Sequence, residues 1–223
     1  MSEIGERTIS VAICVRDGEK YIAFAIESAI HQSVKPESIL VINDGSNDRS
    51  RAIALELNCE VIDLDKKGLA AARNLALSRA ETDLVFFLDS DDLMEEHALR
   101  DLTTALKGAP GAVGATGMRR NFISPELMGK ISVVDQRFLE REKNSLPSGS
   151  LWVRDAASVI RFNENSRTAD VEWALDLRKQ GARLAEAKTT VLNRRIHLDN
   201  ESSKLETRMS YLALAVKNIS GRA

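Results

Sequence analysis

The chain has 223 residues, of which 43% are hydrophobic and 29% are charged, so it can bury the core of one large domain. Its formal net charge of −2 provides no general attraction toward nucleic acid or anionic membranes, and we expect no nucleic-acid partner. The sequence shows neither an apolar signal region nor an uncharged apolar stretch of membrane-spanning length, which favours a cytoplasmic protein.

The first half of the chain alternates between apolar strands and helices. Four segments are typical of strands: residues 8–15, 38–43, 59–64 and 84–88. The run at 84–88 has no polar alternation, as in a strand buried on both faces. A segment that can form a helix follows each of the four: residues 21–30, 49–57, 69–79 and about 95–106. Four strand-then-helix units in succession predict an α/β fold, with a Rossmann-like, mostly parallel sheet flanked by helices on both faces.

The second half of the chain is less regular. Residues 121–143 are mixed and polar, with no clear period. Further along, the pattern predicts a short strand at 151–153, a helix at about 170–180, a strand at 191–196 and a closing amphipathic helix at 202–219. We expect that last helix to pack on the core. A homodimer contact or a peripheral membrane contact through it stays open.

Three carboxylates directly follow the apolar run at residues 84–88. Asp89, Asp91 and Asp92 therefore lie at the carboxyl end of a buried strand, where open α/β sheets bind ligands. A divalent cation relieves the repulsion among such groups, and Mg²⁺ or Mn²⁺ is usually held by one or two carboxylates together with phosphate oxygens and water. A helix N-cap at Ser90 or Asp91 would explain only one or two of these acidic residues, so we favour a metal–phosphate site.

Two further motifs precede this strand. Asp44 begins an Asp-Gly-Ser sequence at the end of the second strand, where its carboxylate can accept the ring N–H of a uracil or guanine. Taken alone, such a sequence is more often only a turn. Gly68 and Arg73 belong to the helix that leads into the central strand. A guanidinium near a helix N-terminus suits phosphate, but Arg73 is equally well explained as an ordinary solvated helix residue.

The later segments carry weaker signals. Asp170 and Glu172 lie at the start of a helix, where the helix dipole favours acidic side chains. On that pattern alone a structural role is the simpler interpretation. His197 comes just after a strand, and an isolated histidine is usually structural.

Five segments occur in an order that resembles family 2 of the glycosyltransferases, which have the GT-A fold. They are VAICVRDGEKYI, ILVINDGSND, GLAAARNLAL, FFLDSDD and TADVEWALDLRKQG. The resemblance covers roughly residues 8–200. It implies a single domain in which residues 1–118 form the half that binds the nucleotide-sugar. Residues 119–223 would form the half that binds the acceptor.

The resemblance assigns the donor site. It implies that Asp44 holds the nucleotide base and that Gly68, Arg73 and Asp89 complete the nucleotide-sugar site. The family usually has a tyrosine after the first strand, where it stacks on the base. Arg16 lies in the corresponding stretch of this chain, and a guanidinium can also stack on a base.

The resemblance also assigns the metal and the catalytic base. The Asp-x-Asp (DXD) element implies that Asp89, Asp91 and by extension Asp92 contact the ribose and a manganese or magnesium ion that bridges the diphosphate. A late histidine that assists the metal would be His197. The catalytic base falls on Asp170.

Glu172 is the fallback for that base, because Ala169 replaces the Glu that usually precedes the catalytic Asp.

These assignments predict a metal-dependent, inverting glycosyltransferase that moves a sugar from a nucleotide-sugar to an acceptor hydroxyl group. We favour a UDP-sugar donor, with GDP- and dTDP-sugars left open, and a glycan or lipid-linked glycan acceptor. A catalytically inactive nucleotide-sugar-binding module is the alternative. A nucleotidyltransferase is less favoured, because the loop after the first strand is not a Gly-rich, Arg-containing loop.

Overall fold

The computed structural model describes residues 7–127, 139–144 and 146–198, together with the single positions 200, 206, 209 and 210. Its strands are β1 (Ile9–Val15), β2 (Ser38–Asp44), β3 (Glu60–Leu64), β4 (Leu84–Asp89), β5 (Leu93–Met94), β6 (Gly114–Ile123), β7 (Arg141–Lys143), β8 (Ser150–Val153) and β9 (Leu184–Ile196). Its helices are α1 (Ile22–Ile30), α2 (Ser50–Glu56), α3 (Leu69–Arg79), α4 (Ala98–Lys107), the 3₁₀ helix η1 (Pro125–Leu127), α6 (Arg154–Ala157) and α7 (Ala169–Lys179).

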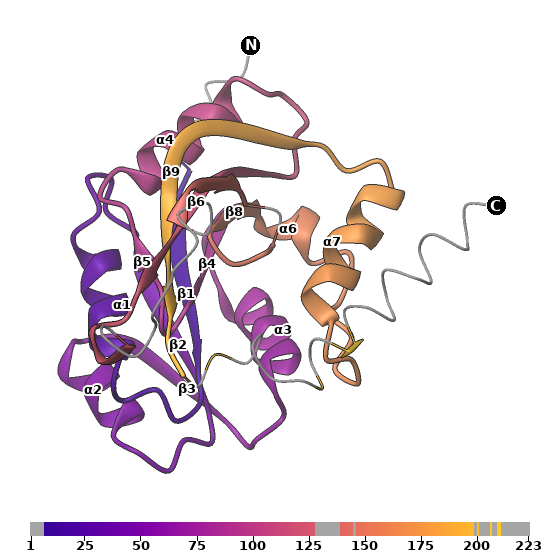
Figure 1. Ribbon diagram of the computed structural model, residues 1–223. Helices are drawn as coiled ribbons and strands as arrows, with labels where there is room; N and C mark the ends of the chain where they lie inside the picture. Colours follow the sequence, from indigo (N-terminus) through magenta and orange to yellow (C-terminus); the bar gives the residue numbers. More distant parts are fainter. Residues whose placement is uncertain are drawn as a thin grey trace.

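The strands form one mixed sheet with the order β3-β2-β1-β4-β8-β6-β9-β5, and β7 pairs with β6 (Figure 1). The first four strands are parallel, as the sequence predicts. Strand β8 is antiparallel to both β4 and β6, and β9 is parallel to β6. Strands β6 and β9 therefore run in the same direction as β4, and their carboxyl ends reach the same edge of the sheet.

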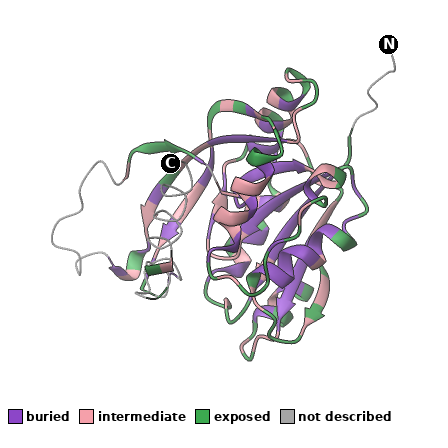
Figure 2. Ribbon diagram, turned by 90° about the vertical axis from the view of Figure 1, so that its right-hand side faces the viewer, coloured by how far each residue is buried: buried purple, intermediate pink, exposed green. Residues whose placement is uncertain are grey.

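Both faces of the sheet are covered, so successive strand residues enter two separate cores. In β4, Phe86 packs with residues of α1, α2 and α4, whereas Phe87 packs with residues of α3, α6 and α7. Figure 1 shows these two groups of helices on opposite sides of the sheet, and Figure 2 shows the buried residues concentrated in the strands between them. Each fully buried large side chain contributes about 1.5–3 kcal/mol, which explains why the central strand tolerates no polar alternation.

Three boundaries differ from the sequence-based expectation. The helix expected from residue 95 begins at Ala98, because Leu93 and Met94 instead pair with β9 as a short strand. The strand expected at 191–196 begins at Leu184, since β6 lies alongside its whole length. Part of the stretch expected to be irregular, residues 141–143, pairs with β6. In all three cases the difference arises because the segment pairs with a strand far away in the sequence. Local composition does not reveal such pairing.

The helix expected at residues 202–219 falls outside the described part of the chain, apart from three of its positions. Among the described residues, no helix combines the length and the apolar character needed to cross a membrane.

Candidate active site at the carboxyl edge of the sheet

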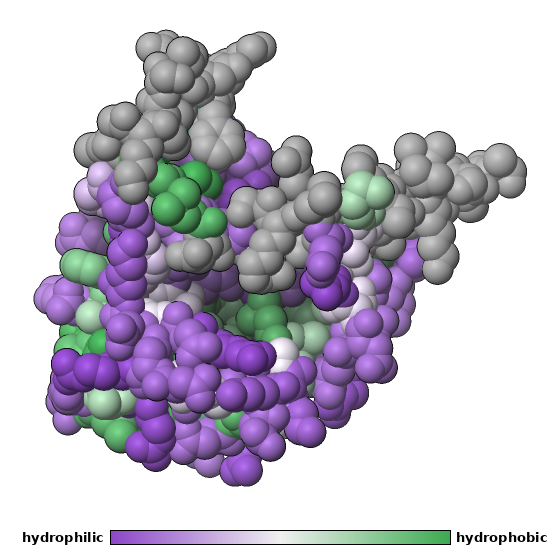
Figure 3. Space-filling view, turned by 60° about the horizontal axis from the view of Figure 1, so that its bottom comes forward, coloured by the Kyte–Doolittle hydropathy of each residue, from purple (hydrophilic) through white to green (hydrophobic). Residues whose placement is uncertain are grey.

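The residues singled out in the sequence lie at the carboxyl edge of the sheet. The edge lies at the bottom of Figure 1 and comes forward in Figure 3, which shows a recess with hydrophobic atoms at its floor and mostly hydrophilic residues around it. Three of the parallel strands end here, at Val15, Asp44 and Asp89. Asp44 and Asp89, which the sequence placed at strand ends, thus lie at one edge of the sheet.

Asp44 is 4% exposed and receives hydrogen bonds from the segment that leads into α3. The backbone N–H groups of Lys67 and Gly68 donate to its two carboxylate oxygens, with N···O distances of 2.6 and 2.8 Å. Gly68 has a φ of +93°, which is costly for residues with a side chain, so glycine suits this approach to Asp44. Asp44 and Gly68 therefore form one unit that connects β2 to the start of α3.

Arg73 connects two of the predicted site carboxylates. Its side chain is 1% exposed, and one guanidinium nitrogen donates to Asp89 Oδ1 at 2.8 Å while the other pairs with Asp170 Oδ1. The small residues Ala72 and Ala76 pack α3 closely onto the sheet, which places Arg73 beneath its edge. Burial alone would lower the pKa of Arg73, but the adjacent carboxylates of Asp170 and Asp89 raise it above its ordinary value.

The same environment affects Asp89. Burial raises the pKa of Asp89 above its ordinary value, and Asp91 and Asp170 add to the shift, whereas the guanidinium of Arg73 opposes it. The side chain of Asp89 is nevertheless 40% exposed, so it stays within reach of a ligand. The backbone N–H of Asp89 donates a hydrogen bond to the Ser148 hydroxyl oxygen at 3.1 Å.

Asp91 and His197 come together although they are 106 positions apart in the chain. His197 Nε2 lies 2.9 Å from Asp91 Oδ2, and the amide of Asn200 donates to the same oxygen at 3.3 Å. The short strand β5 explains this meeting, because Leu93 pairs with Asn193 and so brings the Asp-Ser-Asp-Asp turn against the end of β9.

Asp92 occupies a different environment from Asp91. It is 3% exposed, and its carboxylate accepts the backbone N–H of Arg195 at 2.8 Å. Burial, followed by the nearby charges of Asp91 and Asp89, raises the pKa of Asp92 well above its ordinary value. This buried carboxylate therefore fixes the end of β9 to the turn.

The two acidic residues at the start of α7 also differ in their surroundings. The side chain of Asp170 is 19% exposed and pairs with Arg73, so it lies next to Asp89. Glu172 instead accepts hydrogen bonds from the hydroxyls of Ser166 and Thr168, at 2.7 and 2.9 Å, and from the amide of Asn163 at 3.2 Å. Burial raises the pKa of Glu172, but these three hydrogen bonds outweigh burial and hold the pKa below its ordinary range.

Arg16 stands apart from these clusters. It follows the end of β1 and is exposed, and within the described residues no hydrogen bond or ion pair joins it to the other predicted site residues. The next residue, Asp17, accepts the backbone N–H of Asn47 at 2.7 Å. This bond ties the loop after β1 to the loop after β2, so Arg16 lies beside the Asp-Gly-Ser turn.

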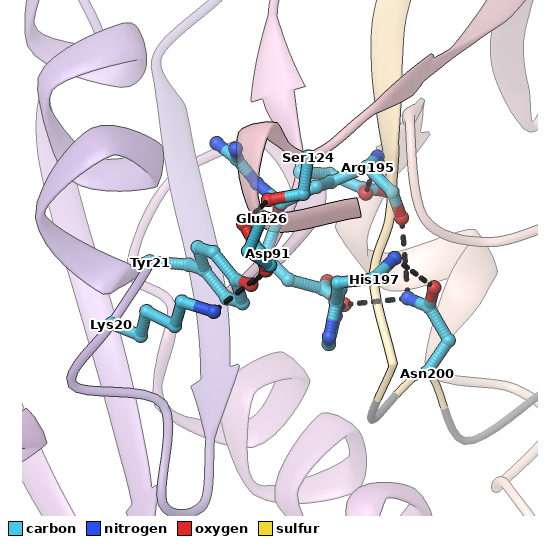
Figure 4. Close-up of polar contacts among 9 residues, drawn as sticks. Lys20, Tyr21, Asp91, Ser124, Glu126, Arg195, His197 and Asn200 are labelled. Carbon is cyan, nitrogen blue, oxygen red and sulfur yellow. Dashed lines mark hydrogen bonds and ion pairs between the residues drawn. The ribbon is translucent and has the colours of Figure 1, made fainter. Parts of the chain in front are cut away.

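Several residues next to Asp91 and His197 were not anticipated. Tyr21, Glu126 and Arg195 surround them, together with Lys20, Ser124 and Asn200 (Figure 4). Tyr21 was expected only as an apolar position of its helix, and Glu126 lies in a polar stretch with no period. No local signal connects Tyr21, Glu126 and Arg195, because they lie in three segments far apart in the chain.

Two donor groups for the predicted divalent cation lie together at the edge. Asp91 supplies a carboxylate oxygen and His197 an imidazole nitrogen, and the Asp91 side chain is 29% exposed. Within the described ranges no cluster of three or more His, Cys, Asp or Glu side chains could hold a metal ion. A cation at Asp91 would therefore need ligands from elsewhere, which suits Mg²⁺ or Mn²⁺ because these ions usually take phosphate oxygens and water as well.

Comparison with known proteins identifies relatives of this chain. Residues 10–162 match the family model described as Glycosyl transferase family 2. A teichoic acid poly(glycerol phosphate) polymerase of Staphylococcus epidermidis is 29% identical over 186 residues, which cover 76% of this chain and 25% of that protein. An uncharacterized glycosyltransferase of Haemophilus influenzae is 36% identical over 101 residues, which cover 41% of this chain and 39% of that protein. The chain thus spans well under half the length of these relatives.

Solved structures share the architecture. TarS of S. aureus in complex with UDP-GlcNAc has a TM-score of 0.69 at 19% identity, covering 94% of this chain and 66% of that one. Glucosyl-3-phosphoglycerate synthase of Mycobacterium tuberculosis, solved with Mn²⁺, UDP and glucosyl-3-phosphoglycerate, has a TM-score of 0.63 at 18% identity, covering 93% and 78%. At these identities the likeness concerns the fold.

Proposed function

We propose that this chain, which belongs to glycosyl transferase family 2 and has the GT-A fold, transfers a sugar from a nucleotide-sugar to an acceptor hydroxyl group with inversion. The observation that carries the proposal is the Asp89–Arg73–Asp170 cluster at the carboxyl edge of the sheet. It joins a partly exposed carboxylate on the central strand to one at the start of α7. A purely structural ion pair would not need the Asp89 side chain to stay 40% exposed.

The donor is a nucleotide-sugar, and we favour a UDP-sugar. The structural relatives TarS and glucosyl-3-phosphoglycerate synthase were solved with UDP-GlcNAc and UDP, respectively, which supports that preference. Asp44, held by the backbone of Lys67 and Gly68, would accept the ring N–H of the base. Arg16, exposed beside the same turn, would cover the base, and Asp89 would contact the ribose.

Arg73 takes a different role from direct binding of phosphate. Both guanidinium contacts go to carboxylates, and the Arg73 side chain is buried. We therefore infer that Arg73 fixes the positions of the Asp89 and Asp170 carboxylates relative to each other. Such a charge-assisted pair fixes the orientation of both groups more firmly than neutral hydrogen bonds do. A divalent cation bound by Asp91, with His197 beside it, would neutralise the charge that develops on the departing diphosphate.

Asp170 acts as the general base. Its carboxylate removes the proton from the acceptor hydroxyl, whose oxygen attacks the anomeric carbon from the side opposite the diphosphate. The new glycosidic bond forms as the bond to the diphosphate oxygen breaks, and the nucleoside diphosphate leaves. The first 118 residues supply the donor side of this arrangement, while the later residues, including α7, supply the acceptor side. We propose a glycan or a lipid-linked glycan as the acceptor.

Donor turnover tests this proposal. Purified protein is incubated with a panel of UDP-, GDP- and dTDP-sugars, with Mn²⁺ or EDTA, and release of nucleoside diphosphate is measured. Asp170→Asn should reduce turnover by about 10²–10⁴-fold, the usual contribution of a general base, while stabilisation of the fold by UDP persists. The control is Asp176→Asn, the same change on the same helix at a half-exposed residue paired with Lys179.

Three outcomes would contradict parts of the proposal. Binding of UDP without turnover of any donor, in the presence of Mn²⁺, would indicate an inactive binding module. Full turnover by Asp170→Asn with loss in Glu172→Gln would place the base on Glu172. Equal turnover in Mn²⁺ and in EDTA would remove the metal from the mechanism.

A further inference from the structure

A polar cluster lies beside His197 and Asp91 (Figure 4). Its central group is Glu126 of η1, which receives the Tyr21 hydroxyl and the Ser124 hydroxyl and pairs with Lys20 Nζ at 2.6 Å (Figure 4). The Lys20 and Ser124 contacts, with that of Tyr21, hold the pKa of Glu126 well below its usual range. The carboxylate is thus a charged anchor for the Tyr21 hydroxyl.

Tyr21 in turn packs on two residues at the end of β9. Its ring centroid is 4.8 Å from that of His197, with the planes tilted by 51°, and the guanidinium carbon of Arg195 lies 4.7 Å from the Tyr21 centroid. Tyr21 is 9% exposed, so its ring fills the space between α1 and β9. The ring is therefore held at its hydroxyl end by Glu126 and along its face by Arg195.

Arg195 is fixed by the turn that carries the metal candidate. Its backbone N–H donates to the buried Asp92 carboxylate and its Nε donates to the backbone oxygen of Asp91, each at 2.8 Å. The Asp-Ser-Asp-Asp turn, Arg195 and Tyr21 are therefore in sequential contact. His197 closes this ring of contacts, because it packs on Tyr21 and its Nε2 lies next to Asp91 Oδ2.

We propose that Tyr21 is a positioning residue that sets the orientation of the His197 imidazole toward Asp91, with Glu126 as the anchor of the tyrosine. The inference rests on the proposed function, because it concerns the metal site assigned there. A histidine at the end of a strand can adopt several side-chain rotamers, and the observed one places Nε2 2.9 Å from Asp91 Oδ2. Packing by Tyr21 selects that rotamer, as neighbouring groups commonly do for imidazole ligands.

Three variants separate this role from ordinary packing. Tyr21→Leu removes the ring, Tyr21→Phe keeps the ring but removes the hydroxyl, and Glu126→Gln removes the charge of the anchor. The matched control is Phe24→Leu. Phe24 lies on α1, three residues after Tyr21, and its ring also lies near Arg195, at 5.8 Å, but it is 54% exposed. If Tyr21 served only in packing, Tyr21→Leu would lower the stability of the protein. The folded variant would keep the His197 NMR signature and the Mn²⁺ affinity of the unmodified protein.

The first readout is free of metal. In the EDTA-treated protein, the ring ¹⁵N resonances of the histidines are recorded by NMR and those of His197 are identified by their loss in His197→Gln. The hydrogen-bonded Nε2 signature should persist in the control, change to a smaller extent in Tyr21→Phe, and change most in Tyr21→Leu. An unchanged signature in folded Tyr21→Leu would overturn the proposal.

The second readout is the affinity for Mn²⁺ in the presence of UDP, measured from the EPR signal of free Mn²⁺. Tyr21→Leu should weaken this affinity by about 10–100-fold, the usual effect of removing a group that orients a ligand, with smaller losses in Tyr21→Phe and Glu126→Gln. The control should bind Mn²⁺ as the unmodified protein does. If Tyr21→Leu does not fold, the losses in Tyr21→Phe and Glu126→Gln decide the matter, and wild-type affinity in both would overturn the proposal.

Asp91→Asn and His197→Gln distinguish failure of this inference from failure of the proposed function. If both retain wild-type Mn²⁺ affinity, the metal site itself is wrong, and the positioning role fails with it. If both lose affinity while the three Tyr21 and Glu126 variants keep it, the metal site stands and only the role of Tyr21 is refuted.

Discussion

Arg73 and Asp170, 97 positions apart in the chain, form an ion pair beneath the carboxyl edge of the sheet. The pair connects α3 to the start of α7, and a second bond from Arg73 to Asp89 adds the end of the central strand. The rings of Phe87 and Phe162 each lie 5.7 Å from the guanidinium carbon, so the cation is enclosed by aromatic and acidic groups. One buried cation is therefore the partner of two carboxylates from different elements.

Replacing Arg73 should therefore destabilise the fold strongly. Arg73→Met would leave the carboxylates of Asp89 and Asp170 without their buried counter-ion, and breaking such a pair costs about 3–5 kcal/mol. Urea unfolding measures this loss. Arg79→Met, an exposed position on the same helix, should change the unfolding free energy by less than about 0.5 kcal/mol. Equal effects in the two variants would show that the pair contributes little.

Asp91 should control the response to metal. UDP is expected to raise the melting temperature more with Mn²⁺ than with EDTA, since a ligand stabilises only the state that binds it. Asp91→Asn should abolish this difference while the unliganded protein stays folded. Asp155→Asn serves as the control, because its side chain is 86% exposed on α6. A Mn²⁺-dependent shift that survives in Asp91→Asn would exclude Asp91 as a ligand.

Glu172 should contribute stability that depends on pH. Its pKa in the folded protein is lowered from the ordinary value of 4.5, so the folded state favours the ionised form. The contribution is therefore present above about pH 4.5 and is lost as the pH falls through the lower folded pKa. Glu172→Gln should be less stable than the unmodified protein at pH 7, and the gap should narrow in acid. Unfolding curves measured from pH 7 to pH 3 check this, and a constant gap would contradict it.

Arg16 should affect the base and not the diphosphate. If its guanidinium stacks on the base, Arg16→Ala removes about 0.5–1 kcal/mol, which corresponds to a Kd for UDP about 2- to 5-fold higher. The Kd for inorganic pyrophosphate should stay the same. Calorimetric titrations of both ligands measure this, with Arg100→Ala on α4 as an exposed control. Parallel losses for UDP and pyrophosphate would indicate that Arg16 acts on phosphate instead.

The sequence predicted the sheet, and the edge at which Asp44 and Asp89 lie, for a physical reason that is local. A run such as Val85-Phe86-Phe87-Leu88 must be buried on both faces, and parallel strands must end at a common edge, so Asp44 and Asp89 were placed at that edge without knowledge of any contact. The buried helix faces follow from the same kind of periodicity. The order of the motifs likewise indicated the family, which the family model then confirmed.

Only the tertiary structure decided what each site residue touches. Asp91 and Asp92 are adjacent in the chain and chemically identical, yet one faces His197 and the other is buried against the backbone of Arg195. That difference arises from the pairing of β5 with β9, about 100 positions later in the chain. Arg73, which the sequence left undecided between solvent and phosphate, meets Asp170 because α3 and α7 cover the same face of the sheet. Such contacts depend on packing between distant segments, and no spacing within one segment encodes them.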